Sequence, residues 1–166
     1  MGLLVYLNMR DKKLRISVIG AGKDCPKEIY DIAYKMGRLL ARNGFVVVCG
    51  GLFGVMEAVA KGASIEGGES IGILPGRDIE SANKYITHPI ATGLGEMRNL
   101  LVVLNGELSV AIGGGYGTLS EIALSFKIGK KVIAIKSWKD IPGVIYTSSP
   151  EEAINTILKL VRMEHE

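Results

Sequence analysis

The stretch IGGGYGTLSEIA, residues 112–123, joins an apolar run to a helical pattern through four glycines. The residues just before it, 108–112, are mostly apolar, as in a buried strand, and a helical pattern begins at Thr118. Glycine lets a ligand approach the backbone closely, and the free N–H groups at a helix N-terminus attract anions. The stretch therefore predicts a strand, a phosphate-binding turn and a helix in succession.

The same succession occurs twice earlier in the chain, at GAGKDCP (20–26) and GGLFG (50–54). Because the strands of a parallel sheet all end at one edge, where open α/β sheets bind ligands, we expect the three turns to line one site. A tight β–α turn without a ligand is the alternative for each turn taken alone. The residues predicted to bind the ligand or its phosphate are Gly20, Gly22, Lys23, Gly50, Gly51, Gly54, Gly114, Gly115, Tyr116, Gly117 and Thr118, with Arg77 after the third strand.

Apolar segments alternate with helical patterns along the whole chain. Strands are expected at 14–22, 45–51, 70–76, 108–115 and 130–135, and shorter ones at 85–92 and 143–149. Helices are expected at 26–43, 54–68, 95–106, 118–128 and from Pro150 onward. Continuously apolar strands are buried on both faces, so they indicate a parallel sheet with helices on each side. We predict an α/β fold, a single Rossmann-like three-layer domain over residues 14–166 with a parallel sheet of about six to seven strands.

Two segments fit this pattern less well. The segment 85–92 contains Pro89, which lacks a backbone N–H, so the segment is expected either at an edge of the sheet or in irregular structure. Residues 1–13 form either an extra strand or a loose tail, and Met9 is an alternative start to Met1.

Composition narrows the classes of function. The net charge is only +3 and basic residues mostly alternate with acidic ones, so we do not expect nucleic-acid binding. The apolar run 2–9 is too short for a membrane span, so we expect no membrane association. Two cysteines without an export signal indicate reduced thiols in a cytoplasmic protein. The two histidines, His88 and His165, lie too far apart in the chain to suggest a metal site.

Two familiar nucleotide motifs are incomplete. In GAGKDC, Cys25 replaces the third glycine of the dinucleotide fingerprint, and no acidic residue follows at the end of the second strand, 48–51. Lys23 is followed by Asp24 and not by Ser or Thr, so there is no phosphate-binding loop of the Walker A type. The sequence disfavours classical NAD binding and P-loop chemistry.

Three segments in order, GGLFGVMEAVAKGA (50–63), EMRN (96–99) and GGGYGTLSE (113–121), resemble the Lonely Guy (LOG) phosphoribohydrolases and their relatives. These relatives include molybdenum-cofactor carriers and lysine-decarboxylase-like proteins, and the resemblance spans about residues 15 to 160. LOG enzymes hydrolyse the N-glycosidic bond of a nucleoside 5′-monophosphate to a free base and ribose 5-phosphate. The resemblance implies that Gly114, Gly115, Gly117 and Thr118 hold the phosphate and that Arg98 and Glu121 are the catalytic pair.

The sequence departs from the LOG pattern at three positions. Gly113 stands where LOG enzymes have proline, Glu57 where they have glycine, and Asn99 where lysine commonly follows the arginine. The segment GVMEAVAKGA (54–63) looks closer to the molybdenum-cofactor carriers, which bind a pterin-type cofactor and need not hydrolyse anything. Two functions therefore stay open: a nucleoside 5′-monophosphate phosphoribohydrolase that requires no cofactor, and a non-catalytic pterin carrier or nucleotide sensor.

Glu121 also has a structural interpretation. Thr118-Leu-Ser-Glu121 has the spacing of a capping box, in which Thr118 caps the helix and Glu121 reaches back to the N-cap amide. A carboxylate suits glycosidic cleavage as well, because it stabilises an oxocarbenium-like transition state or orients water. Arg98, on an otherwise apolar helix, is expected to contact the ligand or Glu121.

The helices 95–106 and 118–128 are more apolar than one face of a sheet requires. LOG-like proteins pair through helices, so the resemblance implies a homodimer or homotetramer.

Overall fold

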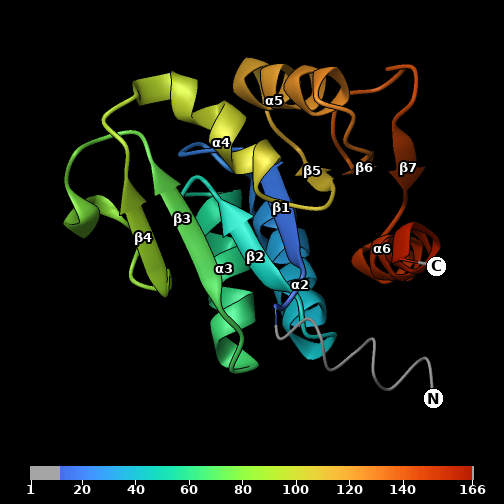
Figure 1. Ribbon diagram of the computed structural model, residues 1–166, viewed down its shortest axis with the longest axis horizontal. Helices are drawn as coiled ribbons and strands as arrows, with labels where there is room; N and C mark the ends of the chain where they lie inside the picture. The colour runs from blue at the N-terminus through green and yellow to red at the C-terminus, as the bar shows by residue number, and fades with distance from the viewer. Residues whose placement is uncertain (1–11, 166) are drawn as a thin grey trace.

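The computed structural model describes residues 12–165 and contains a seven-stranded sheet in the order β4-β3-β2-β1-β5-β6-β7 (Figure 1). Every neighbouring pair of strands is parallel. The strands are β1 (Arg15–Gly20), β2 (Val46–Cys49), β3 (Ser70–Leu74), β4 (His88–Ala91), β5 (Ser109–Ile112), β6 (Val132–Ile135) and β7 (Ile145–Thr147). The predicted Rossmann-like α/β fold is confirmed. Residues 1–11, in the segment predicted to be an extra strand or a tail, lie outside the described residues.

Helices cover both faces of this sheet. They are α2 (Lys27–Arg42), α3 (Val55–Ile65), α4 (Asn99–Leu104), α5 (Tyr116–Lys127) and α6 (Pro150–His165), with two short 3₁₀ turns, η1 (Ile79–Ser81) and η2 (Gly95–Arg98). Side chains of α2, α3 and α6 pack on one face, and side chains of α4 and α5 pack on the other. The three layers expected from the alternation of apolar segments are therefore present.

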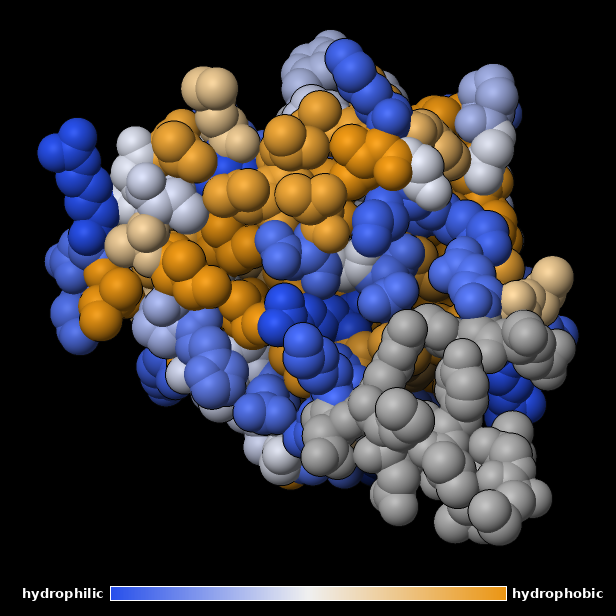
Figure 2. All heavy atoms as spheres, viewed as in Figure 1, coloured by the Kyte–Doolittle hydropathy of each residue, from blue (hydrophilic) through white to orange (hydrophobic). Residues whose placement is uncertain are grey.

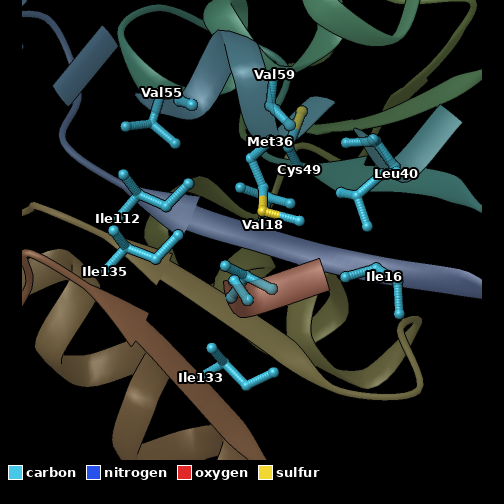
Figure 3. Packing of buried hydrophobic residues seen from close by; sticks show 14 of the residues in the cluster. Ile16, Val18, Met36, Leu40, Cys49, Val55, Val59, Ile112, Ile133 and Ile135 are labelled. Atoms are coloured by element: carbon cyan, nitrogen blue, oxygen red, sulfur yellow. The ribbon is translucent and has the colours of Figure 1, made fainter. Parts of the chain in front are cut away.

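Successive side chains of each strand point to opposite faces of the sheet, so the core is divided into two parts. On β1, Val18 packs with Met36 of α2 and Val59 of α3, whereas the next residue, Ile19, packs with the residues of α4 and α5 (Figure 3). Both strand residues are fully buried. Each face therefore receives an apolar side chain at every second position, as a strand covered on both sides requires.

Two differences from the expected elements bear on the site. The single helix expected at 95–106 is divided into η2 and α4, which meet at Arg98 and Asn99. The helix expected from Thr118 begins two residues earlier, at Tyr116. At the sheet edge, β4 contains Pro89 as predicted, because the open side of an edge strand needs no N–H donor.

Helices α2 and α3 cross at close range because a glycine on each helix faces the backbone of the other helix. A Cβ atom at Gly37 would lie 2.1 Å from the carbonyl oxygen of Val59, and one at Gly62 would lie 2.0 Å from the carbonyl oxygen of Tyr34. Only glycine permits this approach. The crossing fixes α3, and with it the glycine turn that precedes the helix.

Within residues 12–165, no helix is both long enough and apolar enough to cross a membrane.

Candidate functional site

The three glycine turns meet at the carboxyl ends of β1, β2 and β5, where they line a cavity of about 430 Å³. The sequence-predicted residues in its wall are Gly20, Gly22, Lys23, Gly50, Arg98, Gly115, Gly117, Thr118 and Glu121. Strand ends far apart in the chain thus contribute to one site, as expected for a parallel sheet. The N-terminus of α5 forms one side of this cavity, and its free N–H groups make that side attractive to an anion.

Arg98 is the most buried charged group in this wall, with 7% of its surface exposed. Its Nη2 atom lies 3.4 Å from the carbonyl oxygen of Gly50, and its Nη1 donates a hydrogen bond to the side-chain oxygen of Asn99. Its Nε has no hydrogen-bond partner among the described residues. A buried donor without a partner costs about 1–3 kcal/mol. An anionic ligand in the cavity would remove this cost.

Glu121 lies in the second turn of α5, half-buried in the wall of the same cavity. Burial raises the pKa of its carboxyl from an ordinary value of 4.5 to about 8. The positive charge of Arg98 lowers that pKa and the negative charge of Glu96 raises it, but both effects are smaller than the effect of burial. At neutral pH the Glu121 carboxyl is therefore largely protonated and can donate a proton.

The capping-box prediction is wrong. Helix α5 begins at Tyr116 with Gly115 as its N-cap, and the cap has no side-chain hydrogen bond. Thr118 therefore lies inside the first turn, and Glu121 is too far along the helix to reach the N-cap amide. Thr118 is buried, and a Cβ atom at Gly114 would lie 2.0 Å from its Oγ1. This close contact accounts for a glycine at 114.

Three predicted site residues lie outside the cavity wall. Gly51 is buried beside the end of β3, where a Cβ atom would lie 2.7 Å from the side chain of Leu74. Gly54, the N-cap of α3, has a positive φ of 68°, and a Cβ there would lie 2.0 Å from the carbonyl oxygen of Gly22. Arg77 is exposed in the loop after β3. The two glycines shape the turns, and Arg77 does not contribute to the cavity.

Two other predicted residues lie on the far side of the turn after β5. Gly114 lines a neighbouring cavity, and Tyr116 is 83% exposed with its ring centroid 5.6 Å from that of Trp138. Neither residue faces Arg98 and Glu121 across the first cavity.

Sequence reasoning assigned no site role to several residues of the first cavity. Glu96 and Asn99 come from the same short motif as Arg98, and the side-chain amide of Asn99 lies 3.5 Å from the Glu96 carboxylate. Asn99 is buried between these two charged side chains. Met56 packs against the core and also lines the cavity. The motif spacing could have indicated Glu96 and Asn99, whereas the amphipathic pattern of α3 gives no such signal for Met56.

Within the part of the chain that the structure describes, no group of three or more His, Cys, Asp or Glu residues is placed to hold a metal ion.

The fold and the site define a Rossmann-like α/β protein with a cavity at the carboxyl ends of its strands. The model of the SLOG cluster4 family matches residues 13–164, and the chain belongs to this family. An uncharacterised protein of Archaeoglobus fulgidus is 46% identical over 144 residues, which are 87% of this chain and 94% of that protein. The resemblance to LOG-like proteins is confirmed.

Two solved structures are similar over nearly the whole chain. The molybdenum cofactor binding protein of Rippkaea orientalis has a TM-score of 0.86 and 34% identity, covering 92% of this chain and 99% of that one. The molybdenum cofactor carrier protein of Chlamydomonas reinhardtii has a TM-score of 0.85 and 31% identity, covering 91% and 99%.

Proposed function

We propose that this protein binds a nucleoside 5′-monophosphate in the first cavity and hydrolyses its N-glycosidic bond. The observation that carries the proposal is the pairing of a buried arginine that has an unused Nε donor with a carboxyl whose pKa is about 8, in one cavity. The arginine suits an anionic group, and the protonated carboxyl of Glu121 suits a leaving base.

The phosphate is proposed to bind at the N-terminus of α5, beside Gly115, Gly117 and Thr118. This position combines free N–H groups with the positive end of the helix dipole. Lys23, exposed in the turn after β1, adds a positive charge to the same cavity. Arg98 offers its free Nε to the same phosphate, and the ribose then lies beside Glu121.

The chemistry follows from the protonation state of Glu121. Its carboxyl donates a proton to the leaving base as the bond from C1′ to the base nitrogen breaks. The carboxylate formed in this step carries a negative charge at the place where the ribosyl group becomes oxocarbenium-like. Glu121 then takes a proton from the water that attacks C1′, which regenerates the acid and yields ribose 5-phosphate and the free base.

A carrier of a phosphorylated pterin cofactor is the second candidate function, and the two solved relatives named for molybdenum cofactor favour it. As far as residues 12–165 line it, the wall of the first cavity contains an unpaired buried arginine donor but no cysteine or histidine. These residues suit the phosphate of a carried cofactor and offer no thiolate or imidazole to a metal. In that function Glu121 shapes the cavity and transfers no proton.

One experiment separates the two functions. The purified protein is incubated with a panel of nucleoside 5′-monophosphates, and free base and ribose 5-phosphate are followed by chromatography. Hydrolysis is expected to fall by about 100-fold or more in Glu121→Gln, which cannot act as an acid. Glu80→Gln, in the exposed turn η1, is the matched control and is expected to keep full activity.

Ligand-induced shifts of the melting temperature are measured on the same panel and on a phosphorylated pterin. Stabilisation by the pterin without base release from any nucleotide would support the carrier function and overturn the hydrolase. Base release that survives Glu121→Gln would overturn the proposed role of Glu121.

A further inference from the structure

A second cavity of about 640 Å³ lies on the other side of the turn after β5. Its wall includes Gly113, Gly114, Lys136, Ser137 and Trp138. It shares Gly22, Lys23 and Gly115 with the first cavity. The two cavities therefore adjoin at the N-terminus of α5 and the turn after β1, where the first cavity is proposed to hold a phosphate.

The second cavity has an aromatic wall. The indole Nε1 of Trp138 donates a hydrogen bond to the carbonyl oxygen of Gly115 at 2.9 Å, which fixes the ring beside the shared turn. The Tyr116 ring lies 5.6 Å away at an interplanar angle of 39° and is 83% exposed. Rings placed in this way offer a stacking surface to a heterocycle.

Three cationic side chains line the two cavities, together with the acidic side chain of Asp24 in the second one. Lys23 belongs to both cavities, and Lys136 lines the second one. Lys136 forms an exposed ion pair with Glu28 and has a positive φ of 47°, which is uncommon for a residue other than glycine. Arg98, with its unpaired Nε, lines the first cavity. The three cationic side chains suit an anionic group at the junction, and Trp138 in the wall of the second cavity suits a stacked ring.

We propose that one ligand occupies both cavities: a pyrophosphate-bridged molecule with a ring system at each end. The pyrophosphate lies at the N-terminus of α5 between Arg98 and Lys23, one nucleoside enters the first cavity, and the second ring stacks beside Trp138. A dinucleotide and a pterin dinucleotide share this chemistry. This inference rests on the proposed phosphate site, and it adds a second ring to the ligand.

The chain contains a single tryptophan, Trp138, so tryptophan fluorescence reports on the wall of the second cavity. The protein is titrated with AMP, ADP and diadenosine pyrophosphate, in which two adenosines share one pyrophosphate. The dinucleotide is expected to bind at least about 10-fold more tightly than ADP and to quench Trp138, because base–aromatic stacking adds affinity. Equal affinities for ADP and the dinucleotide, without quenching, would overturn the inference.

A pair of variants tests the second cavity directly. Lys136→Asn removes the charge while asparagine tolerates the positive φ, so the loop is expected to keep its shape. The dinucleotide is expected to lose about 10-fold in affinity in this variant, and AMP less than about twofold. Lys139→Asn, an exposed lysine of the same loop outside both cavities, is the control and is expected to change neither affinity.

The two proposals fail in different ways. If AMP binds and Arg98→Gln abolishes that binding while the dinucleotide gains nothing, the phosphate site stands and the second ring site is overturned. If neither AMP nor the dinucleotide binds, both are overturned. Flavin adenine dinucleotide, a probe with a pterin-like ring, distinguishes the two kinds of ligand. Tighter binding than that of diadenosine pyrophosphate would favour a pterin dinucleotide, and weaker binding would favour a dinucleotide of two nucleosides.

Discussion

The guanidinium of Arg98 depends on the absence of a side chain at Gly50. Nη2 of Arg98 lies 3.4 Å from the carbonyl oxygen of Gly50, and a Cβ atom on that glycine would lie only 2.7 Å from Nη2. The same Cβ would lie 2.6 Å from the sulfur of Met56. The end of β2, the turn η2 and the first turn of α3 are thus fitted together around one buried cation.

Gly50→Ala is expected to damage binding more than folding. The atoms that the new methyl group would meet are the ends of two flexible side chains, which can move at small cost in stability, but Arg98 cannot then keep its position. We expect a loss of about 10-fold or more in affinity for a nucleoside 5′-monophosphate, measured by calorimetry, with a change of less than about 1.5 kcal/mol in the free energy of unfolding. Gly76→Ala, where a Cβ meets nothing within 4 Å, is the control. Unchanged affinity in Gly50→Ala would contradict the role given to Arg98.

Glu121→Gln is expected to stabilise the protein at alkaline pH. The pKa of Glu121 is raised by burial to about 8, so between its ordinary value of 4.5 and about 8 the folded state holds a proton that the unfolded state has lost. The contribution of this group to stability therefore falls as the pH rises through that range. The loss is about 1.4 kcal/mol for each pKa unit that separates the folded from the unfolded state. Glutamine cannot ionise and escapes this loss.

The check is thermal unfolding of both proteins at several pH values. The melting temperature of Glu121→Gln is expected to exceed that of the native chain by a margin that grows from about pH 5 to about pH 8 and is constant above it. If the melting temperatures of the two proteins instead change with pH in parallel, the Glu121 carboxyl ionises in the folded state as it does in water, and the prediction is wrong.

The proposed hydrolysis has a pH dependence of its own. Glu121 acts as an acid, so the active form of the free enzyme is lost as the pH rises through its pKa of about 8. We expect kcat/KM for base release to fall about tenfold per pH unit above that value. A rate that instead rises between pH 6 and pH 9, to be judged from initial rates in buffers of constant ionic strength, would mean that Glu121 works as a base.

The sequence predicted the sheet and the meeting of the three glycine turns because both depend on local patterns. Continuous apolar runs specify buried parallel strands, and glycines directly after them specify sharp turns at one edge. The element order follows from these patterns, and of the two alternatives that Pro89 left open, the structure shows the edge position of β4. None of these features depends on how distant side chains pack.

The details of the site depend on packing, and there the sequence was less informative. The start of α5 was misplaced because Gly115 and Tyr116 enter the helix without a capping side chain, so Thr118 looked like the first cap. The division of the helix near Arg98 and the second role of Met56 likewise depend on neighbours from other segments. The proximity of Trp138 to Tyr116 comes from residues 22 positions apart in the chain, which no short motif reports.

Gly62→Ala is expected to destabilise the fold through the crossing of α2 and α3. The new methyl group would lie 2.0 Å from the carbonyl oxygen of Tyr34, and backbone cannot move aside as a side chain end can. Alanine favours a helix by about 1 kcal/mol over glycine, but we expect the clash to outweigh this and to lower the free energy of unfolding by about 2 kcal/mol or more. Chemical denaturation of Gly62→Ala beside Gly76→Ala measures the difference, and equal stability would show that the two helices can separate freely.

Substitutions on α4 are expected to control self-association. Met97, Leu100 and Leu104 are 78%, 38% and 50% exposed along η2 and α4, and Figure 2 shows hydrophobic side chains gathered over this part of the molecule. Exposed apolar patches of this kind mark protein–protein contacts, and we propose that a second copy of the chain covers this one. Sedimentation at micromolar concentration is expected to show a dimer or tetramer for the native chain and a monomer for Leu104→Glu.

Met163→Glu is the matched control for this prediction, because Met163 is also 71% exposed but lies on α6, which packs on the opposite face of the sheet from α4. It is expected to leave the assembly unchanged. The same dissociation in both variants would point to a general effect of added charge, and a native chain that sediments as a monomer would remove the interface altogether. If the assembly depends on Leu104, the helix that follows Arg98 directly in the chain is also the helix that joins the subunits.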